Sequence, residues 1–268
     1  MSFLNLENKN ILVTGVANKK SVAWCIAKTL EEEGANVIIA DINPDTGNQV
    51  SNEINKKSGQ SHFIETDVSD LNSVKNMVEE TVKQFGPPDV LINNAGINVF
   101  NEPLKMSIEE WKRAFSVDLD GVWFGCQCVL PYMVEKKKGA IVNLASVHAI
   151  QIIPNCFPYP VAKHGVIGLT KALAVDYAEK GIKINAISPG YTETPILDRF
   201  FSTKPDPIAA RKEASERQPI KRMGTTTEIA NTILFMSSDE CNFMIGANIV
   251  VDGGITLKMH DNTNTGAG

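Results

Sequence analysis

Short apolar runs, each about the length of a β-strand, recur along the chain and alternate with segments of helical pattern. Most of these runs are rich in valine and isoleucine and are apolar on both alternating faces, which is typical of strands covered on both sides. They span residues 10–15, 36–41, 62–67, 89–94, 140–145, 182–188 and 248–254. Between the first two runs, Val22, Ile26 and Leu30 recur on one helix face. The alternation predicts an α/β protein with a doubly wound parallel sheet and helices on both faces.

The 268 residues hold no linker rich in proline, glycine or serine and no internal repeat, so we expect a single domain over residues 1–268. Residues 191–225 break the alternation, because they are polar and charged and carry four prolines. They would lie at the carboxyl edge of the sheet, where ligands bind in such folds. We therefore expect a mobile substrate lid, with a surface helical excursion as the alternative. The tail, residues 255–268, ends in DNTNTGAG and is expected to be poorly structured.

The overall charge and the cysteines exclude several classes of function. A net charge of −5 argues against a nucleic-acid partner, and no apolar run approaches the roughly 20 residues that a membrane span needs. The opening MSFLNLENKN lacks the basic segment and apolar core of a signal peptide. Five cysteines without a CxxC pair favour neither a disulfide framework nor a metal site. We expect a cytoplasmic protein with reduced thiols, no metal, and no nucleic-acid or membrane partner.

The first run leads directly into a turn and a helix, which would bring backbone N–H groups and a helix N-terminus beneath a pyrophosphate. The pattern GxGxxG is absent, because Gly15 is followed by a longer turn that contains Asn18. Ser21 and Ala23 stand where close-approach glycines are expected, and their small side chains still permit close approach of a ligand. Gly15, Asn18, Ser21 and Val22 are therefore candidate cofactor residues, although the segment alone is equally typical of an ordinary strand–helix turn.

Asp41 ends the second run and makes the dinucleotide interpretation stronger. A carboxylate at this strand end accepts hydrogen bonds from an adenosine ribose 2′-OH and repels a 2′-phosphate, which favours NAD over NADP. Lys19 and Lys20 act in the opposite direction, because a cation in the turn pairs with a 2′-phosphate. We rank Asp41 higher because of its position, while noting that it also suits a cap for the turn before Pro44.

Further motifs follow the successive strand-like runs in a fixed order. They are Asp67–Val68, Asn93–Asn94–Ala95–Gly96, Ser146, Tyr159-Pro160-Val161-Ala162-Lys163, and Pro189–Gly190 with Thr192 and Thr194. Tyr159 follows Ser146 by 13 residues. In this order and spacing the motifs resemble the short-chain dehydrogenase/reductase family, and the resemblance spans nearly the whole chain, as far as Asp252–Gly253–Gly254.

The resemblance implies a Rossmann-type oxidoreductase that is usually a homotetramer or homodimer. It implies that Ser146, Tyr159 and Lys163 are catalytic, and that Tyr159 and Lys163 also bind the nicotinamide ribose. The remaining implied cofactor contacts are Asp67 and Val68 at the adenine, Asn94, Ala95 and Gly96 at the adenosine ribose, and Pro189, Gly190, Thr192 and Thr194 at the nicotinamide end.

Two segments depart from the family pattern. The turn TGVANKKSVAWCIA looks more like that of the enoyl-acyl-carrier-protein reductases, although those enzymes space their tyrosine and lysine differently. We therefore interpret it as a local variant of the turn. Asp118 stands where the family usually has an asparagine in a helix kink, whose backbone carbonyl contacts the lysine through water. Asp118 is accordingly a fourth candidate catalytic residue, and its charge would raise the pKa of a nearby lysine.

The catalytic set suits hydride chemistry. Hydride transfer to a carbonyl leaves an alkoxide that needs a proton, and the reverse reaction needs a base. A tyrosine, with an ordinary pKa near ~10, needs about 4 kcal/mol of preference for the phenolate to act as that base at neutral pH. A lysine four residues later lies on the same helix face, and its charge at ~5 Å supplies roughly 3 kcal/mol at an effective dielectric constant of ~20. An oxidised nicotinamide supplies the rest, and Ser146 holds the substrate oxygen.

Substrate identity is less constrained than the reaction. The candidate pocket residues are Asn98, His148, Gln151, Asn155, Phe157 and Tyr191, with His148, Asn155 and Tyr191 as the main substrate contacts. This polar set favours a secondary alcohol such as a sugar or polyol. The first alternative is a 3-oxoacyl-thioester reductase, for which Arg199, Lys204, Arg211 and Lys212 would form a basic doorway. A non-catalytic dinucleotide sensor is the alternative from another class, and the intact Ser–Tyr–Lys set argues against it.

Overall fold

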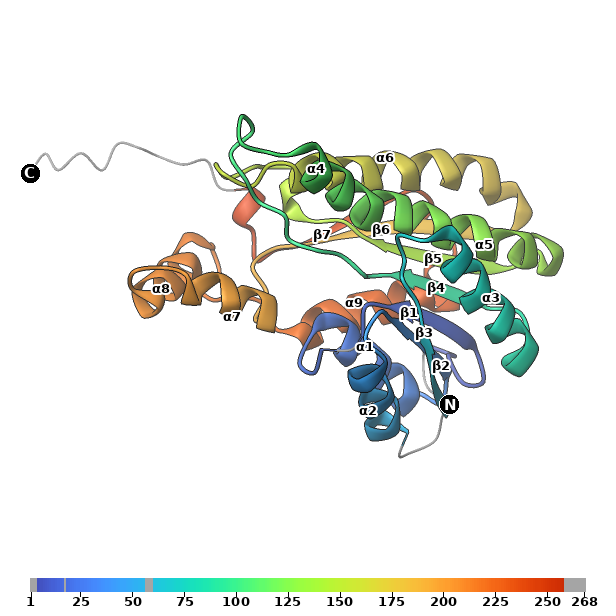
Figure 1. The fold of residues 1–268 in the computed structure, drawn as a ribbon. Helices are drawn as coiled ribbons and strands as arrows, with labels where there is room; N and C mark the ends of the chain where they lie inside the picture. The colour runs from blue at the N-terminus through green and yellow to red at the C-terminus, as the bar shows by residue number, and fades with distance from the viewer. Residues whose placement is uncertain (1–3, 17, 56–59, 258–268) are drawn as a thin grey trace, which may run out of the picture.

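The computed structural model describes residues 4–16, 18–55 and 60–257. Its centre is a parallel sheet of seven strands in the order β3-β2-β1-β4-β5-β6-β7 (Figure 1). The strands are β1 (Asn10–Thr14), β2 (Asn36–Asp41), β3 (Gln60–Glu65), β4 (Val90–Asn93), β5 (Gly139–Leu144), β6 (Ile182–Pro189) and β7 (Asn248–Val251). Each apolar run of the sequence thus overlaps a strand, and the predicted doubly wound α/β fold is confirmed.

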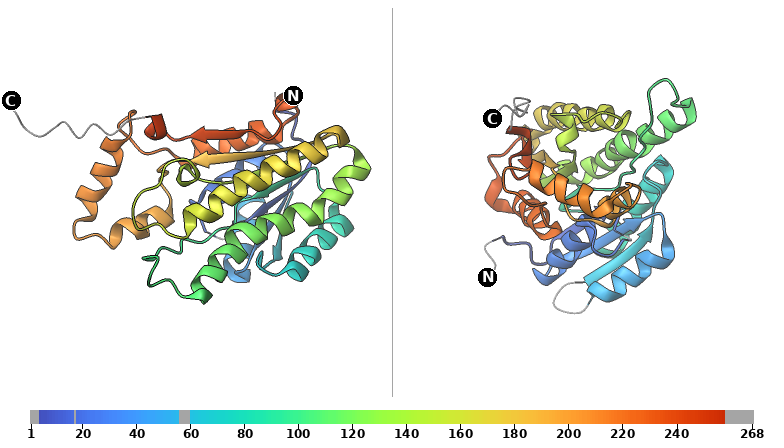
Figure 2. Two further views of the ribbon diagram at one scale, coloured as in Figure 1. Left: turned by 90° about the horizontal axis from the view of Figure 1, so that it is seen from above. Right: turned by 90° about the vertical axis from the view of Figure 1, so that its left-hand side faces the viewer.

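Helices cover both faces of the sheet, as Figures 1 and 2 show. One layer holds α1 (Val22–Glu32), α2 (Pro44–Ile54) and α9 (Thr226–Ser237), and the other holds α3 (Leu71–Phe85), α4 (Ile108–Phe115), α5 (Gly121–Lys136) and α6 (Tyr159–Tyr177). Successive strand residues contribute to the two layers in turn: Ile11 and Val13 pack with the first, and Leu12 packs with the second. Because both faces are covered, most strand positions are apolar, and buried polar residues such as Asn143 and Asn185 are hydrogen-bonded exceptions.

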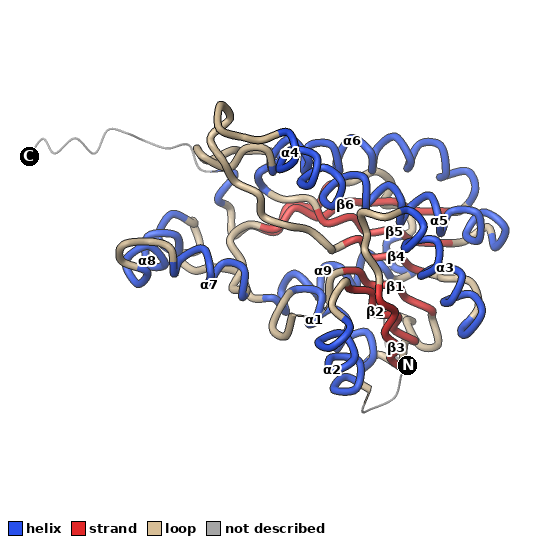
Figure 3. The backbone as a smooth tube through the Cα atoms, viewed as in Figure 1, coloured by secondary structure: helices blue, strands red, loops and turns tan. Residues whose placement is uncertain are grey.

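The chain reverses its winding direction at β1, which pairs with β2 on one side and with β4 on the other. The loops that leave the carboxyl ends of β1 and β4 therefore turn to opposite faces and open a crevice between them, where ligands bind in sheets of this kind. Figure 3 shows the long loops gathered at this edge of the sheet, on the side where α7 (Pro195–Ser202) and α8 (Pro207–Arg217) lie.

Residues 191–225 form a helix pair, α7 and α8, that stands away from the main body (Figures 1 and 2). Thr194 caps α7 and Asp206 caps α8 through their side-chain oxygens. Phe201, Ala214 and Met223 form a small buried cluster of their own between the helices. The segment therefore has more internal structure than its polar composition suggests. Its conformation is the surface helical excursion that the sequence analysis gave as the alternative to a mobile lid.

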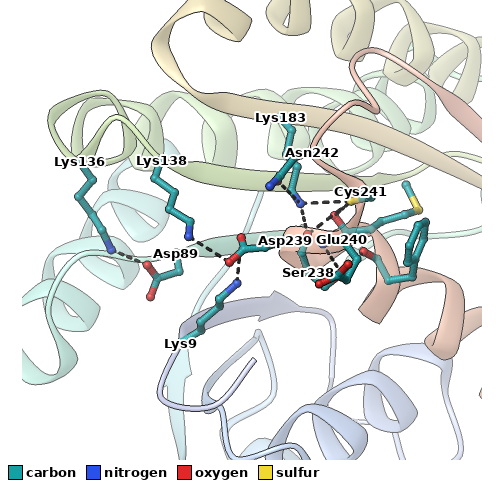
Figure 4. A network of polar contacts seen from close by, with 12 residues as sticks. Lys9, Asp89, Lys136, Lys138, Lys183, Ser238, Asp239, Glu240, Cys241 and Asn242 are labelled. Atoms are coloured by element: carbon teal, nitrogen blue, oxygen red, sulfur yellow. Dashed lines mark hydrogen bonds and ion pairs between the residues drawn. The ribbon is translucent and has the colours of Figure 1, made fainter. Parts of the chain in front are cut away.

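At the opposite, amino-terminal edge of the sheet, polar contacts (Figure 4) join residues, most of which line a cavity of about 350 Å³. Asp239 accepts from Lys9 at 3.3 Å and from Lys138 at 3.0 Å, and Lys136 pairs with Asp89 at 2.5 Å. These contacts tie the loop after α9 to the sheet, and they leave the carboxyl edge as the side with long, open loops. None of the helices in the described ranges is long and apolar enough to cross a membrane.

The end of the described chain is more ordered than we expected from the sequence. Ile255–Leu257 form a short 3-10 helix after β7. Asp252 fastens it, because its carboxylate accepts from the backbone of Thr256 at 2.9 Å and from the Thr256 hydroxyl at 2.7 Å. The expectation of a poorly structured tail is thus wrong for residues 255–257, and residues 258–268 lie outside the described part of the chain.

Candidate active site

Ser146, Tyr159 and Lys163 line one cavity of about 640 Å³ at the carboxyl edge of the sheet. Ser146 lies just after β5 and caps a short 3-10 helix, Val147–Ala149, while Tyr159 and Lys163 occupy the first two turns of α6. Ser146 is 7% exposed and Lys163 is 4% exposed. The structure thus brings together three side chains that the sequence places on two separate elements.

Lys163 provides a buried positive charge beside the phenol of Tyr159. Its ammonium donates to the backbone carbonyl of Leu144 at 3.1 Å and lies 5.5 Å from the centroid of the Tyr159 ring. A cation at this distance in a partly desolvated cavity stabilises negative charge on the phenol oxygen. The four-residue spacing on α6 therefore produces the electrostatic arrangement that the sequence predicts.

Two aromatic rings hold Tyr159 edge-on. The Phe100 ring lies 5.6 Å from it at 85°, and the His148 imidazole lies 6.0 Å from it at 83°. Ser146 Oγ accepts a hydrogen bond from the His148 backbone at 3.1 Å, so the hydroxyl keeps its own proton for a further partner. The two hydroxyls are thereby held by rigid neighbours, which favours a fixed geometry for a substrate oxygen.

His148 is neutral in this setting. Burial lowers the pKa of its imidazole, and among the described residues its Nδ1 atom has no hydrogen-bond partner. A neutral imidazole presents one donor and one acceptor and attracts no anion. His148 therefore contributes shape and one polar group to the cavity, without a charge.

Asp118 is completely buried inside a π-helical turn, Ser116–Asp120, between α4 and α5. Its Oδ1 atom accepts from the Ile97 backbone at 2.9 Å, and its Oδ2 atom has no hydrogen-bond partner in the described part of the chain. Burial raises the pKa of the Asp118 carboxyl, and the positive charge of Lys163 opposes part of that shift. A π-turn is a local helix irregularity that is frequent at functional sites.

Only glycine fits between Asp118 and Lys163. A Cβ atom on Gly96 would lie 2.8 Å from Asp118 Oδ1 and 3.6 Å from Lys163 Nζ. The loop after β4 therefore passes directly between the buried carboxyl and the buried ammonium. Gly96 lines the cavity together with Asn94, as the sequence motif predicts for a loop at the sheet edge.

The turn after β1 and the loop after β4 are joined at their backbones. The Asn94 amide donates to the carbonyls of Thr14 at 3.0 Å and Gly15 at 3.3 Å. Gly15 has a φ of +78°, and a Cβ on it would lie 2.7 Å from the Ala95 Cα. Ser21 caps α1 by accepting from the Trp24 backbone at 3.1 Å. This close, side-chain-free approach beside a helix N-terminus fits a pyrophosphate.

Asp41 and Asp67 lie at the carboxyl ends of β2 and β3. Asp41 accepts from the Asn43 backbone at 3.1 Å, which is the capping role considered for it above. Asp67 accepts from the backbone and the hydroxyl of Ser69 at 2.9 and 2.7 Å. Lys19 pairs with Glu53 on α2 at 2.6 Å. Asp41 thus stands at the strand end expected to meet a ribose, while Lys19 is paired with a neighbouring carboxylate.

At the other end of the site, the segment after β6 forms one wall of the cavity. The residues from this segment that line it include Pro189, Gly190, Tyr191, Thr192 and Thr194. A Cβ on Gly190 would lie 2.8 Å from the Asp252 Cα, so glycine is required where this segment passes β7. Val22 lines the cavity from the start of α1, whereas Val68 packs against the start of α5.

Four of the six candidate pocket residues line the cavity, namely Asn98, His148, Gln151 and Tyr191. Asn155 does not: it is exposed, has a φ of +63°, and is absent from the cavity wall. Phe157 faces Trp111, with ring centroids 5.6 Å apart, and also lies outside the wall. The structure therefore does not bring Asn155 into the cavity with the other candidates, and its role as a substrate contact stays a prediction.

Several lining residues were not identified from the sequence. They are mostly apolar: Ile97, Phe100, Ile152, Ile153, Ile196, Leu197, Phe200 and Ile255. The spacing of residues 196, 197 and 200 is an amphipathic helical signal that marks one face of α7. No local pattern marks Ile255 and Thr256, since they reach the cavity only through a tertiary contact, in which Gln151 donates to the Thr256 carbonyl at 2.7 Å.

A family model described as enoyl-(acyl carrier protein) reductase matches residues 15–256. Among curated relatives, the 3-oxoacyl-[acyl-carrier-protein] reductase of Thermotoga maritima is 35% identical over 95% of this chain and all of its own length. The cyclohexanol dehydrogenase of an Acinetobacter species is 35% identical over 94% of this chain and 96% of its own.

Solved structures agree with these relatives. Levodione reductase superposes with a TM-score of 0.90 at 32% identity, over 94% of this chain and 99% of that one. The L-sorbose reductase of Gluconobacter frateurii, complexed with NADPH and L-sorbose, shares the fold with a TM-score of 0.91 at 23% identity, over 96% of this chain and all of that one. The chain belongs to the short-chain dehydrogenase/reductase family and is an oxidoreductase that interconverts an alcohol and a carbonyl group.

Proposed function

We propose that the protein transfers a hydride between NAD(H) and a secondary alcohol or ketone, with Tyr159 as the acid–base group. The observation that carries this proposal is the convergence of Ser146, Tyr159 and the buried ammonium of Lys163 on one cavity. The same convergence argues against a non-catalytic sensor, because dinucleotide binding alone does not need a serine hydroxyl facing a tyrosine.

In the proposed mechanism each residue has a separate task. A bound nicotinamide supplies or accepts the hydride. Tyr159 gives a proton to the substrate oxygen during reduction and takes it back during oxidation. Ser146 donates a hydrogen bond to that oxygen, because its hydroxyl proton is free while the His148 backbone N–H donates to its oxygen. Lys163 stabilises the negative charge left on the phenol.

Asp118 completes the set as a positioning residue. Its carboxyl orients the loop after β4 through the Ile97 backbone, and its charge state affects the field at Lys163. The family's usual asparagine is neutral at this position, so the carboxyl is the main chemical departure of this chain from the family pattern.

The proposed cofactor is NAD(H) in preference to NADP(H). Asp41 at the end of β2 disfavours a 2′-phosphate by charge repulsion. Glu53 already pairs with Lys19, the cation that would otherwise favour that phosphate. Both observations act in the same direction.

The second candidate function is 3-oxoacyl-thioester reduction, which the names of several relatives favour. It requires a basic doorway for an acidic carrier protein. Arg211 instead pairs with Asp198 and Glu193, and Lys212 lies 3.8 Å from Glu216. Two of the four cations of the proposed doorway are therefore paired with carboxylates of the same segment, which disfavours this alternative.

We further propose a cytoplasmic homo-oligomer, a dimer or tetramer as is usual in the family. Support comes from the edge strand β7, where Val250 is exposed, and from the neighbouring loop that holds Phe243 and Ile245. Apolar side chains beside an unpaired strand edge favour burial against a second copy.

Tyr159→Phe should abolish turnover while leaving NADH binding intact, because the hydroxyl is needed for proton transfer and not for binding. We expect kcat to fall by roughly 10²–10⁴-fold, and the dissociation constant of NADH to change little, as measured by fluorescence titration. Tyr177→Phe at the far end of α6 is the control. If the variant retained more than about a tenth of the wild-type kcat, Tyr159 would not be the acid–base group.

Asp118→Asn should stabilise the protein at neutral pH. The folded-state pKa of this carboxyl is raised, so its contribution to stability is present at low pH and is lost as pH rises through that pKa. We expect the variant's Tm at pH 8 to exceed that of the wild type by about 2–4 °C, the shift produced by 1 kcal/mol. The difference in Tm between the variant and the wild type should shrink as pH falls toward ~4. A Tm difference that did not change with pH would show that ionisation of the Asp118 carboxyl does not destabilise the fold.

Asp41→Ala should narrow the preference for NAD(H). We expect kcat/KM of the wild type to be higher with NAD(H) than with NADP(H). In the variant, the ratio of these two kcat/KM values should fall by at least about tenfold, because the repulsion of the 2′-phosphate disappears. Asp45→Ala, in the exposed first turn of α2, is the matched control. A wild-type enzyme that prefers NADP(H) would show that the lysines of the first turn decide the choice.

We also propose that the helix pair in residues 191–225 closes over substrate. Its cluster of buried residues is small, and α7 contributes Ile196, Leu197 and Phe200 to the cavity. Backbone amides of 191–225 should exchange with solvent quickly in the free protein and more slowly when NAD and a substrate are both bound. Equal protection in all states would indicate a fixed helix pair.

A further inference from the structure

The cavity walls around the reacting groups are apolar and come from four different segments. Phe100 follows β4, Ile152 and Ile153 follow the short helix after Ser146, Leu197 and Phe200 belong to α7, and Ile255 follows β7. Ser146 and Tyr159 present the hydroxyls that are expected to meet the substrate oxygen, and the other hydroxyls of the wall belong to Tyr191, Thr192, Thr194 and Thr256. A molecule in this space meets hydrocarbon on most sides of its reacting carbon.

Part of this apolar wall is left uncovered. Ile152 is 60% exposed and Ile196 is 46% exposed, although both line the cavity. Large aliphatic side chains at the mouth of a cavity gain most from a ligand that covers them with its own apolar surface. A ligand covered in hydroxyl groups would leave that gain unused.

Charge is almost absent from the cavity. Among the described residues that line it, Lys163 is the one charged side chain, and its ammonium already donates to the Leu144 carbonyl. His148 is neutral because burial lowers the pKa of its imidazole. A carboxylate or phosphate on the substrate would therefore lose its hydration without gaining a counter-ion.

Three of the polar side chains of the wall are engaged by the protein itself. The Gln151 amide donates to the Thr256 carbonyl at 2.7 Å, the Thr256 hydroxyl donates to Asp252 at 2.7 Å, and the Thr192 hydroxyl donates to the Gly190 carbonyl at 3.1 Å. A polyol brings several hydroxyls that each need a partner once buried. Each one left without a partner weakens binding by roughly tenfold.

We propose that the substrate is a compact, uncharged and predominantly apolar secondary alcohol of the alicyclic kind, or its ketone. This deepens the proposed function and rests on it. The alcohol carbon would give its hydride to NAD⁺ while its hydroxyl proton passes to the phenolate of Tyr159, which leaves the ketone, NADH and the neutral phenol. The cavity therefore points away from the sugar or polyol that the polar residues of the sequence favour.

Three probes test the substrate class: cyclohexanol, sorbitol and 3-hydroxybutyrate, each with NAD⁺ and followed by NADH absorbance. We expect kcat/KM for cyclohexanol to exceed the values for the polyol and for the anion by at least 100-fold. Leu197→Asn, which adds an amide to the α7 wall, should lower kcat/KM for cyclohexanol by at least tenfold and leave NADH binding unchanged. Ile208→Asn on α8 is the matched control, because Ile208 is 82% exposed and lies outside the cavity wall.

A binding measurement keeps the test independent of turnover and of the folding of the Leu197 variant. In Tyr159→Phe saturated with NAD⁺, calorimetry should detect cyclohexanol at concentrations where sorbitol gives no heat. Equal or better turnover or binding of sorbitol or 3-hydroxybutyrate would overturn the substrate class and leave the proposed reaction standing. NADH binding without turnover of any alcohol or ketone would instead overturn the proposed function.

Discussion

All strands of the central sheet run in the same direction, and the rest of the molecule depends on this constraint. Each parallel pairing needs a crossover that returns the chain to the same end, so every loop after a strand emerges at one edge. Ser146 after β5, Asp41 after β2 and Pro189 at the end of β6 share that edge for this reason alone. The site is thus assembled from residues that are distant in sequence and equivalent in topology.

The charges at the centre of the site lie in a poorly solvated environment. Lys163 and Asp118 are almost fully buried. The Lys163 ammonium donates to the Leu144 carbonyl, and the Asp118 carboxyl accepts from the Ile97 backbone N–H. Isolated buried charges are costly, and a protein tolerates them where they perform a task. The buried ammonium strengthens the field at Tyr159, and the carboxyl that replaces a neutral amide adjusts that field.

Part of the cavity wall comes from segments that are peripheral to the Rossmann core. Helix α7 and Ile255 bring apolar side chains to the cavity that holds Ser146, Tyr159 and Lys163. At the amino edge of the sheet, in contrast, the ion pairs of Asp89 and Asp239 join neighbouring segments. Ion pairs therefore dominate the amino-terminal edge of the sheet. The carboxyl edge combines the Ser146, Tyr159 and Lys163 side chains with a mostly apolar cavity wall.

The strand runs, the helix between residues 21 and 34 and the Tyr159–Lys163 spacing are local patterns, and each of them determined its part of the structure from the sequence alone. Periodicity reports burial directly, and residues four apart on a helix share a face whatever surrounds them. The tertiary structure alone decided that Asn155 turns outward, that Ile255 and Thr256 reach the cavity, and that Gln151 is engaged by the chain end. These outcomes depend on contacts between segments about a hundred residues apart, such as Gln151 and Thr256, and such contacts leave no periodic trace in either segment.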